Sequence, residues 1–219
     1  MKKTRVFWVA PFVLLTILTA NAQQRIGFVG GLNFANFASL KAVSADVNVF
    51  GRRTLFGLGG VLELGMGKNT ALRLEPMYLQ KGAKGTLEGL DFEWNLVYFE
   101  VPAFLKLNIV SSPYNLYFLA GPTLGLILTA KMKIFGIEFN IVDATSSIDF
   151  GLGFGAGFSF PIGKNAIFVE GHYTHGFANI ADEGKIVTGG EELEFEEGDM
   201  AKNTGIQIMA GVTFPFGGY

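Results

Sequence analysis

The chain has 219 residues, no cysteine and a formal net charge of −2. This length suits one all-β domain, the lack of cysteine excludes disulfides and thiolate metal sites, and the small charge, without a basic stripe, argues against nucleic-acid binding. Hydrophobic residues make up 49% of the chain, yet no apolar run beyond residue 22 reaches the ~18 residues of a spanning helix. A membrane chain without such helices must pair its backbone between strands, which predicts a β-barrel.

The N-terminal segment has the three parts of a secretion signal. Its basic start consists of Lys2, Lys3 and Arg5, an apolar stretch covers residues 6–18, and residues 20–22 read Ala-Asn-Ala. An A-x-A triplet after a short apolar stretch is typical of a cleavage site. We therefore expect residues 1–22 to be a cleaved signal peptide and residues 23–219 to form the barrel domain. An uncleaved membrane anchor is the alternative.

The remaining chain consists of alternating segments separated by polar, glycine-rich breaks, the pattern of strands and turns. Eight segments are expected: 25–37, 54–65, 70–81, 93–110, 116–130, 147–162, 166–179 and 203–216. Most are longer than the ~9–11 residues that a tilted strand needs to cross a bilayer. Loss of the signal would change the net charge from 17 − 19 = −2 to 14 − 19 = −5.

Segment 147–162 shows the alternation most clearly. Apolar residues occupy the even positions from Ile148 to Phe160, and Asp149, Ser159 and glycines occupy the odd positions between them. One face would meet lipid, and the glycine-rich face would suit a crowded barrel lumen better than water. Segment 116–130 is apolar on both faces. A short buried helix is its alternative, although its glycines and its proline argue against one.

The breaks between segments alternate in length. Short breaks cover 67–69, 111–115 and 163–165, and long breaks cover 40–53, 82–92, 131–146 and 180–202. Short turns on one side and long loops on the other are typical of an eight-stranded antiparallel up-and-down transmembrane barrel. An even number of strands places both termini on the short-turn, periplasmic side. Glycines at the centres of 131–141 and 186–195 predict hairpins within two of the long loops.

One stretch of segment 93–110 resembles a known family. Residues 98–106 read Tyr-Phe-Glu-Val-Pro-Ala-Phe-Leu-Lys, and Ala-Gly-Pro follows at 120–122. These residues resemble the Y-x-E-[IV]-P-x-x-x-K and A-G-P motifs of the PorT-like outer-membrane β-barrel family of Bacteroidetes. Gly-Gly-Leu-Asn at 30–33 and the aromatic C-terminal Tyr219 are similar too. The resemblance implies an eight-stranded barrel, while a role in secretion does not follow from the fold.

Alternation places eight ionisable side chains on inward faces: Glu63, Arg73, Glu75, Glu100, Lys106, Asp149, Glu170 and His172. A lipid-facing Arg or Lys near the membrane centre would cost about 2–4 kcal/mol, so the inward face is favoured. These groups would form either a polar conduit or a salt-bridged plug, and an eight-stranded barrel is only just wide enough for its own side chains. Pro102 cannot donate to a ladder, so an irregularity such as a bulge is expected there.

Catalytic and metal signals are weak. Glu170 and His172 share a face near the outer rim and His175 points the other way, but no nucleophile elbow and no His/Cys metal spacing occur. We therefore expect no enzyme, no cofactor and no metal. Segment 180–202 is strongly acidic, with Asp182, Glu183, Glu191, Glu192, Glu194, Glu196, Glu197 and Asp199. Calcium binding and a solvated acidic loop are its two interpretations.

The leading hypothesis is a closed, monomeric barrel of the cell outer membrane. It would contact outer-membrane lipid and act as a structural or interaction protein, with envelope protein partners docking on its extracellular loops. A narrow transporter of small or hydrophobic solutes is the first alternative. A lipid-modifying enzyme at the rim is the second.

Overall fold

The computed structural model describes residues 24–40, 47–87, 90–111, 114–134, 136–142, 145–180, 185–188, 191–194 and 201–217. The expected signal peptide, residues 1–22, lies outside these ranges. Within them, no helix is long and apolar enough to cross a membrane. The regular structure of these residues is antiparallel β-sheet.

Seven long strands and two shorter ones form a closed sheet, which we call the wall. The long strands are β1 (Gln24–Leu40), β3 (Arg53–Gly65), β7 (Leu90–Ser111), β8 (Asn115–Ile134), β10 (Ile148–Ile162), β11 (Asn165–Gly176) and β14 (Ala201–Phe216). The two shorter strands are β4 (Thr70–Leu74) and β5 (Met77–Lys81). Shorter strands lie in the long breaks: β2 (Val47–Gly51), β6 (Lys84–Leu87), β9 (Ile137–Asn140), β12 (Lys185–Thr188) and β13 (Glu191–Glu194).

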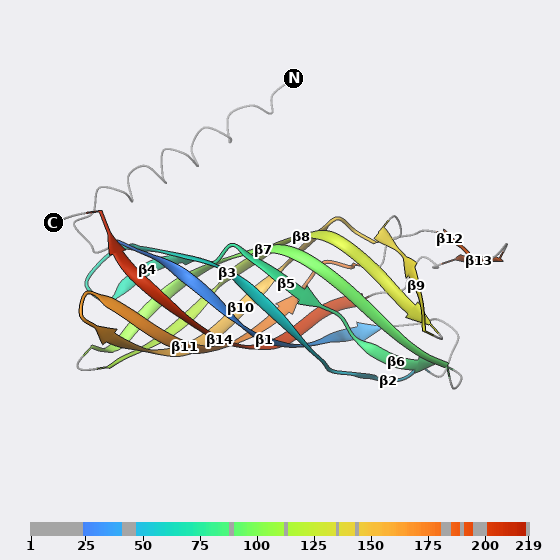
Figure 1. The fold of residues 1–219 in the computed structure, drawn as a ribbon, viewed down its shortest axis with the longest axis horizontal. Coiled ribbons are helices and arrows are strands. Elements are labelled where there is room, and N and C mark those ends of the chain that lie inside the picture. The colour runs from blue at the N-terminus through green and yellow to red at the C-terminus, as the bar shows by residue number, and fades with distance from the viewer. Residues whose placement is uncertain are drawn as a thin grey trace, which may run out of the picture.

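The ladders close on themselves. Neighbours follow the order β7–β4–β3–β1–β14–β11–β10–β8, and a further ladder joins β8 back to β7. The first and last strands pair along their whole lengths, from Gln24 opposite Phe216 to Leu40 opposite Ala201. Figure 1 shows the slanted strands and, at the end farther from β4, the extensions formed by β2, β6 and β9. We call that end the long-loop end and the opposite one the short-turn end.

Two prolines explain the interruption between β4 and β5. The Glu75 amide donates to the Pro102 carbonyl at 3.1 Å, and the Gly60 amide donates to the Pro76 carbonyl at 2.9 Å. A proline has no N–H, so neither Pro76 nor Pro102 can donate a hydrogen bond back to its partner. Each of these residue pairs therefore makes one backbone hydrogen bond instead of two. The registers on both neighbours continue unchanged across the break, so β4 and β5 follow one path.

The irregularity expected at Pro102 lies on its β4–β5 side, and no bulge forms there in the ladder with β8. The β7–β8 register continues through Pro102 opposite Thr123 and shifts instead between Val97 and Tyr98 and between Asn108 and Val110. The effect of Pro102 falls on its other neighbour, because the missing N–H faces Glu75 rather than β8.

Successive side chains point alternately to the inner and the outer face of the sheet, as the sequence predicts. Along β10, burial alternates residue by residue, with Asp149 and the glycines inward and Phe150, Phe154 and Phe158 more than half exposed. A belt of exposed large apolar side chains this extensive requires an apolar solvent. β8 is a strand and not a buried helix. Its second apolar face, Tyr117 and Leu119, packs inward on Phe104.

Two of the long breaks contain the expected hairpins. β8 and β9 pair around a tight turn in which Gly136 has a φ of +81°, a left-handed value that favours glycine. β12 pairs with β13 in the acidic segment. The structure adds β2 and β6, which pair with each other outside the wall and which no pattern predicted.

Candidate functional site: a polar network across the lumen

All eight ionisable residues that alternation placed inward are buried, with relative exposures between 0% and 6%. They divide into two groups. The short-turn cluster consists of Glu63, Arg73, Glu75, Lys106, Glu170 and His172, joined by Tyr117. The long-loop cluster contains Glu100 and Asp149, joined by Lys81, Tyr98 and Asn203.

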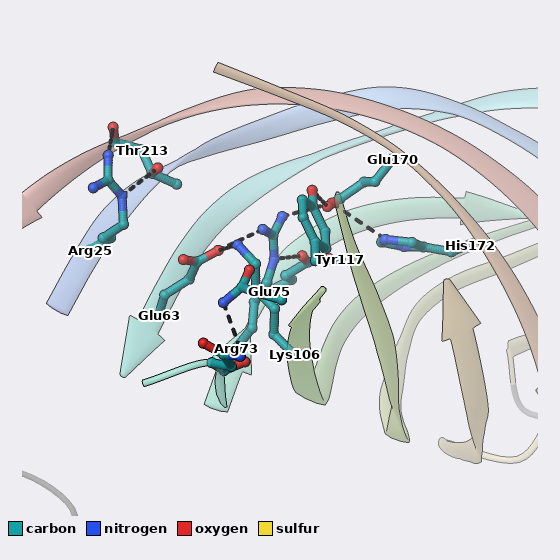
Figure 2. A network of polar contacts seen from close by, with 11 residues as sticks. Arg25, Glu63, Arg73, Glu75, Lys106, Tyr117, Glu170, His172 and Thr213 are labelled. Carbon is teal, nitrogen blue, oxygen red and sulfur yellow. Dashed lines mark hydrogen bonds and ion pairs between the residues drawn. The ribbon is translucent and has the colours of Figure 1, made fainter. Parts of the chain in front are cut away.

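Arg73 is the centre of the short-turn cluster and is fully buried. Its Nε donates to Glu75, and its two terminal nitrogens donate to Glu63 Oε1 and Glu170 Oε1, both at 2.7 Å. Its guanidinium also lies 4.4 Å from the Phe168 ring centroid. Figure 2 shows the carboxylates converging on this one side chain. The fork of an arginine suits such multiple recognition, and charge-assisted bonds of this kind are strong.

A second cation and a phenol complete the cluster. Lys106 Nζ donates to Glu63 Oε1 at 2.7 Å, and the Tyr117 hydroxyl donates to Glu170 Oε2 at 2.6 Å. The ammonium of Lys106 lies 4.1 Å from the centroid of the Tyr117 ring. Buried charges are tolerated when partners replace the lost water, and most oxygens here have such partners.

His172 faces two carboxylates. Its Nε2 lies 3.3 Å from Glu170 Oε1, and its ring packs on Phe104 with centroids 5.3 Å apart. Three carboxylates (Glu63, Glu75 and Glu170) stand against two permanent cations (Arg73 and Lys106) in this cluster. A protonated His172 would balance the charges.

The same residues include a candidate set of metal ligands. Glu75, Glu170 and His172 each offer one ligand atom, and these atoms lie within 4.8 Å of one another. Within the described part of the chain, Glu75 Oε2 and the ring nitrogens of His172 have no hydrogen-bond partner. However, Arg73 already bonds both carboxylates. A dication there would be repelled by the guanidinium, so the geometry favours a proton over a metal.

The long-loop cluster contains one ion pair and one bridging amide. Lys81 pairs with Glu100 and lies 3.6 Å from Asp149. Asn203 Nδ2 donates to the Tyr98 hydroxyl at 2.7 Å and to Asp149 Oδ2 at 2.8 Å. Lys81, Tyr98, Tyr117 and Asn203 belong to these clusters but were not among the residues expected from the sequence. Lys81 occupies an odd-numbered position in the same segment as Arg73 and Glu75, so the alternation predicts that its side chain also points inward.

Glycines of β10 make the room that the network needs. A Cβ on Gly157 would lie 2.5 Å from Tyr117 Cζ, and one on Gly155 would lie 2.7 Å from His172 Cδ2. A Cβ on Gly153 would lie 2.7 Å from the Phe104 ring. Real side-chain atoms do not approach so closely, so the glycine face of β10 is shaped by the large side chains opposite it.

Both clusters join walls that face each other. From β4 to β11 the ladder path has the same number of steps through β3, β1 and β14 as through β7, β8 and β10. Arg73 on β4 nevertheless bonds Glu170 on β11 directly. Asn203 on β14 and Tyr98 on β7 are related in the same way. Side-chain atoms therefore span the full width of the lumen at two levels.

The placement of His172 differs from the rim position that a lipid-modifying enzyme needs. Its side chain is 1% exposed and is enclosed in the lumen beside Glu170. His175 instead packs against Phe177, with ring centroids 5.5 Å apart. Of the acidic segment 180–202, the structure describes Ile180, β12, β13 and residues 201–202. Asp182, Glu183, Glu196, Glu197 and Asp199 lie outside the described residues.

An antiparallel sheet that closes on itself, with an apolar outer face and charged residues paired inside, defines a β-barrel of the membrane-spanning class. A family model described as "Outer membrane protein beta-barrel domain" matches residues 21–182. The chain belongs to this family, and its location is the outer membrane. A comparison with curated proteins found no match.

Two solved structures share the fold. The outer membrane protein OprG from Pseudomonas aeruginosa is 13% identical, with 89% of this chain and 96% of that chain covered and a TM-score of 0.52. A major outer membrane protein from Thermus thermophilus is 14% identical, with 89% and 100% covered and a TM-score of 0.52. At these identities the likeness concerns the fold alone.

Proposed function

We propose that this protein is a closed outer-membrane barrel that serves as a structural or interaction protein of the envelope through its long-loop end. The observation that carries the proposal is the direct bond between Arg73 and Glu170 from facing walls of the lumen. A conduit needs a continuous path of water, and these side chains occupy the centre of that path. The network is thus a rigidifying plug rather than a selectivity filter.

The long-loop end of the lumen is closed by apolar packing as well. Trp94 and Phe37 pack edge to face with ring centroids 5.2 Å apart, and Leu96, Ile141 and Ile180 are buried in the same cluster. Ile141 and Ile180 come from the long breaks, so residues of these breaks pack into the same cluster as side chains of the strands. Apolar closure above a paired polar layer supports a barrel without a pore, and it leaves the outer segments as the working surface.

The proposed barrel crosses the membrane eight times. We count β4 and β5 as one membrane-crossing strand, which gives eight such strands in the ladder order described above. Residues 1–22 are removed on secretion, and the short turns then lie in the periplasm. Within its family, the 98–106 stretch supports placing the chain among the PorT-like members.

Conductance tests the closed lumen directly. Purified protein is inserted into planar bilayers, and insertion is verified on recovered protein by the different migration of boiled and unboiled samples. We expect no stable current steps above those of protein-free membranes. Regular openings would contradict the proposal and favour the narrow transporter. As a second readout, vesicles loaded with a small sugar should retain it equally with and without the protein.

A further inference from the structure

A cavity of ≈ 380 Å³ lies in the wall at the long-loop end and shares only Lys81 with the lumen network. Its lining comes from β3, β5, β7, β8 and β9, and it includes Arg53, Gln80, Glu93, Lys131, Lys133 and Glu138. It also includes Lys81 and Leu96, which are buried on the inner face. The cavity therefore reaches into the thickness of the sheet.

The cavity exists because the β3–β5 ladder ends early. Its described pairs stop at Gly57 opposite Leu79, so none joins Leu55 or Phe56 to β5. The Gln80 carbonyl, left without a strand partner on that side, accepts a hydrogen bond from Asn33 Nδ2 at 2.7 Å. Arg53 crosses the gap, with one terminal nitrogen donating to the Trp94 carbonyl at 2.9 Å and the other 3.4 Å from Glu93.

The lining is cationic in an acidic chain. Four basic residues, Arg53, Lys81, Lys131 and Lys133, face two acidic ones, Glu93 and Glu138. Lys81 is neutralised within the lumen, Arg53 pairs with Glu93, and Lys131 pairs with Glu138 at 3.1 Å. The Lys131–Glu138 pair is about half exposed and so contributes little by itself. Lys133 lies opposite Glu93 and Glu138 on the neighbouring strands, but these carboxylates pair with Arg53 and Lys131, and no ion pair joins either of them to Lys133 among the described residues.

The apolar belt ends at the edge of this cavity. Leu126 and Leu128 on β8 are exposed, and Lys131 and Lys133 follow on the same strand. Phe99 lies opposite both Leu126 and Tyr78, and Tyr78 stacks on Phe56 with ring centroids 5.8 Å apart. Aromatic rings below and lysines above are the arrangement expected where acyl chains give way to headgroups.

We propose that this cavity binds the phosphate of a membrane lipid whose headgroup carries a net negative charge, with Lys131 and Lys133 contacting the phosphate and the Phe56–Tyr78–Phe99 surface contacting the acyl chain. This binding site is additional to the proposed closed barrel and does not depend on a sealed lumen. A lipid should bind more tightly than free phosphate, because only the lipid would also contact the aromatic surface.

The test is lipid binding to the whole folded protein by native mass spectrometry from a zwitterionic detergent. The probes are phosphatidic acid, phosphatidylcholine of the same chain length, and inorganic phosphate. The variant is Lys131→Gln/Lys133→Gln. The matched control is Lys68→Gln/Lys164→Gln, which removes the same charge from two exposed turn residues at the other end of the barrel. Migration of unboiled samples checks that each variant is folded.

We expect wild type and control to bind phosphatidic acid equally and the Lys131/Lys133 variant to bind it at least about tenfold more weakly, because both charge-assisted contacts to the phosphate are lost. Equal loss in both variants would overturn the proposal, because nonspecific charge would then explain the binding. Equal binding of phosphatidylcholine, or inorganic phosphate bound as tightly as the lipid, would also overturn it. If the double variant does not fold, Lys133→Gln alone keeps the Lys131–Glu138 pair and should still weaken binding severalfold. Conductance in planar bilayers is a separate readout for the closed lumen.

Discussion

Arg73 and Glu170 are 97 residues apart in the chain and lie on strands that face each other across the barrel, yet their side chains are joined at 2.7 Å. This contact links the two halves of the wall through the lumen rather than along the sheet. Other buried ionisable groups also find partners on different strands, as Lys106 does with Glu63 and Lys81 with Glu100.

The first prediction concerns the centre of this network. Arg73→Met should destabilise the folded barrel by about 3–5 kcal/mol, because it leaves buried carboxylates without their cation. Denaturant titration in detergent micelles, followed by Trp fluorescence, measures the change. Arg52→Met is the matched control, since Arg52 is exposed, and it should alter stability little. Equal effects of the two substitutions would show that the Arg73 network does not stabilise the fold.

The Asn203–Tyr98 hydrogen bond gives a second prediction, tested by a double-mutant cycle. Asn203→Ala and Tyr98→Phe should each destabilise the protein, and the double variant should lose less than the sum of the two. The expected coupling free energy is about 0.5–1.5 kcal/mol, the usual net contribution of one hydrogen bond. Strict additivity would mean that the contact across the lumen contributes nothing measurable.

The third prediction concerns the glycine face of β10. Gly157→Ala should cost about 1–3 kcal/mol, because the new Cβ would lie 2.5 Å from Tyr117 Cζ and must displace a tightly packed ring. Gly171→Ala on the neighbouring strand is the control, since the nearest atom to its Cβ is 3.9 Å away. Unfolding midpoints compare the two. A tolerated Gly157→Ala would indicate that the lumen is looser than the packing implies.

The fourth prediction concerns the orientation of the barrel in the membrane. The chain has no cysteine, so a single introduced cysteine can be labelled selectively. Ile137→Cys, at an exposed position of the β8–β9 hairpin, should react on intact cells with a membrane-impermeant maleimide, and Lys164→Cys in a short turn should react only after lysis. The reverse pattern would place the long-loop end in the periplasm.

Much of the fold follows from local patterns in the sequence. A strand turns successive side chains to opposite faces, so the alternation in 147–162 was enough to predict both the strand and its inward face. The same rule selected Glu63, Arg73 and Glu170 as inward residues. The missing N–H of Pro102 predicted an irregularity at that residue, but the sequence does not show which neighbouring strand the irregularity affects.

By itself, then, the sequence determined that the chain forms β-strands, which charged residues point inward, and that short and long breaks alternate. Each of these features depends on residues close together in the chain. The tertiary structure alone decided which charges meet. Arg73 bonds Glu170, and Asn203 bonds Tyr98, only because ring closure brings facing walls within reach. It also decided where the β3–β5 ladder stops and a cationic cavity opens, since that depends on three strands together. Parity is a property of one strand, whereas partner choice depends on the order and stagger of all of them.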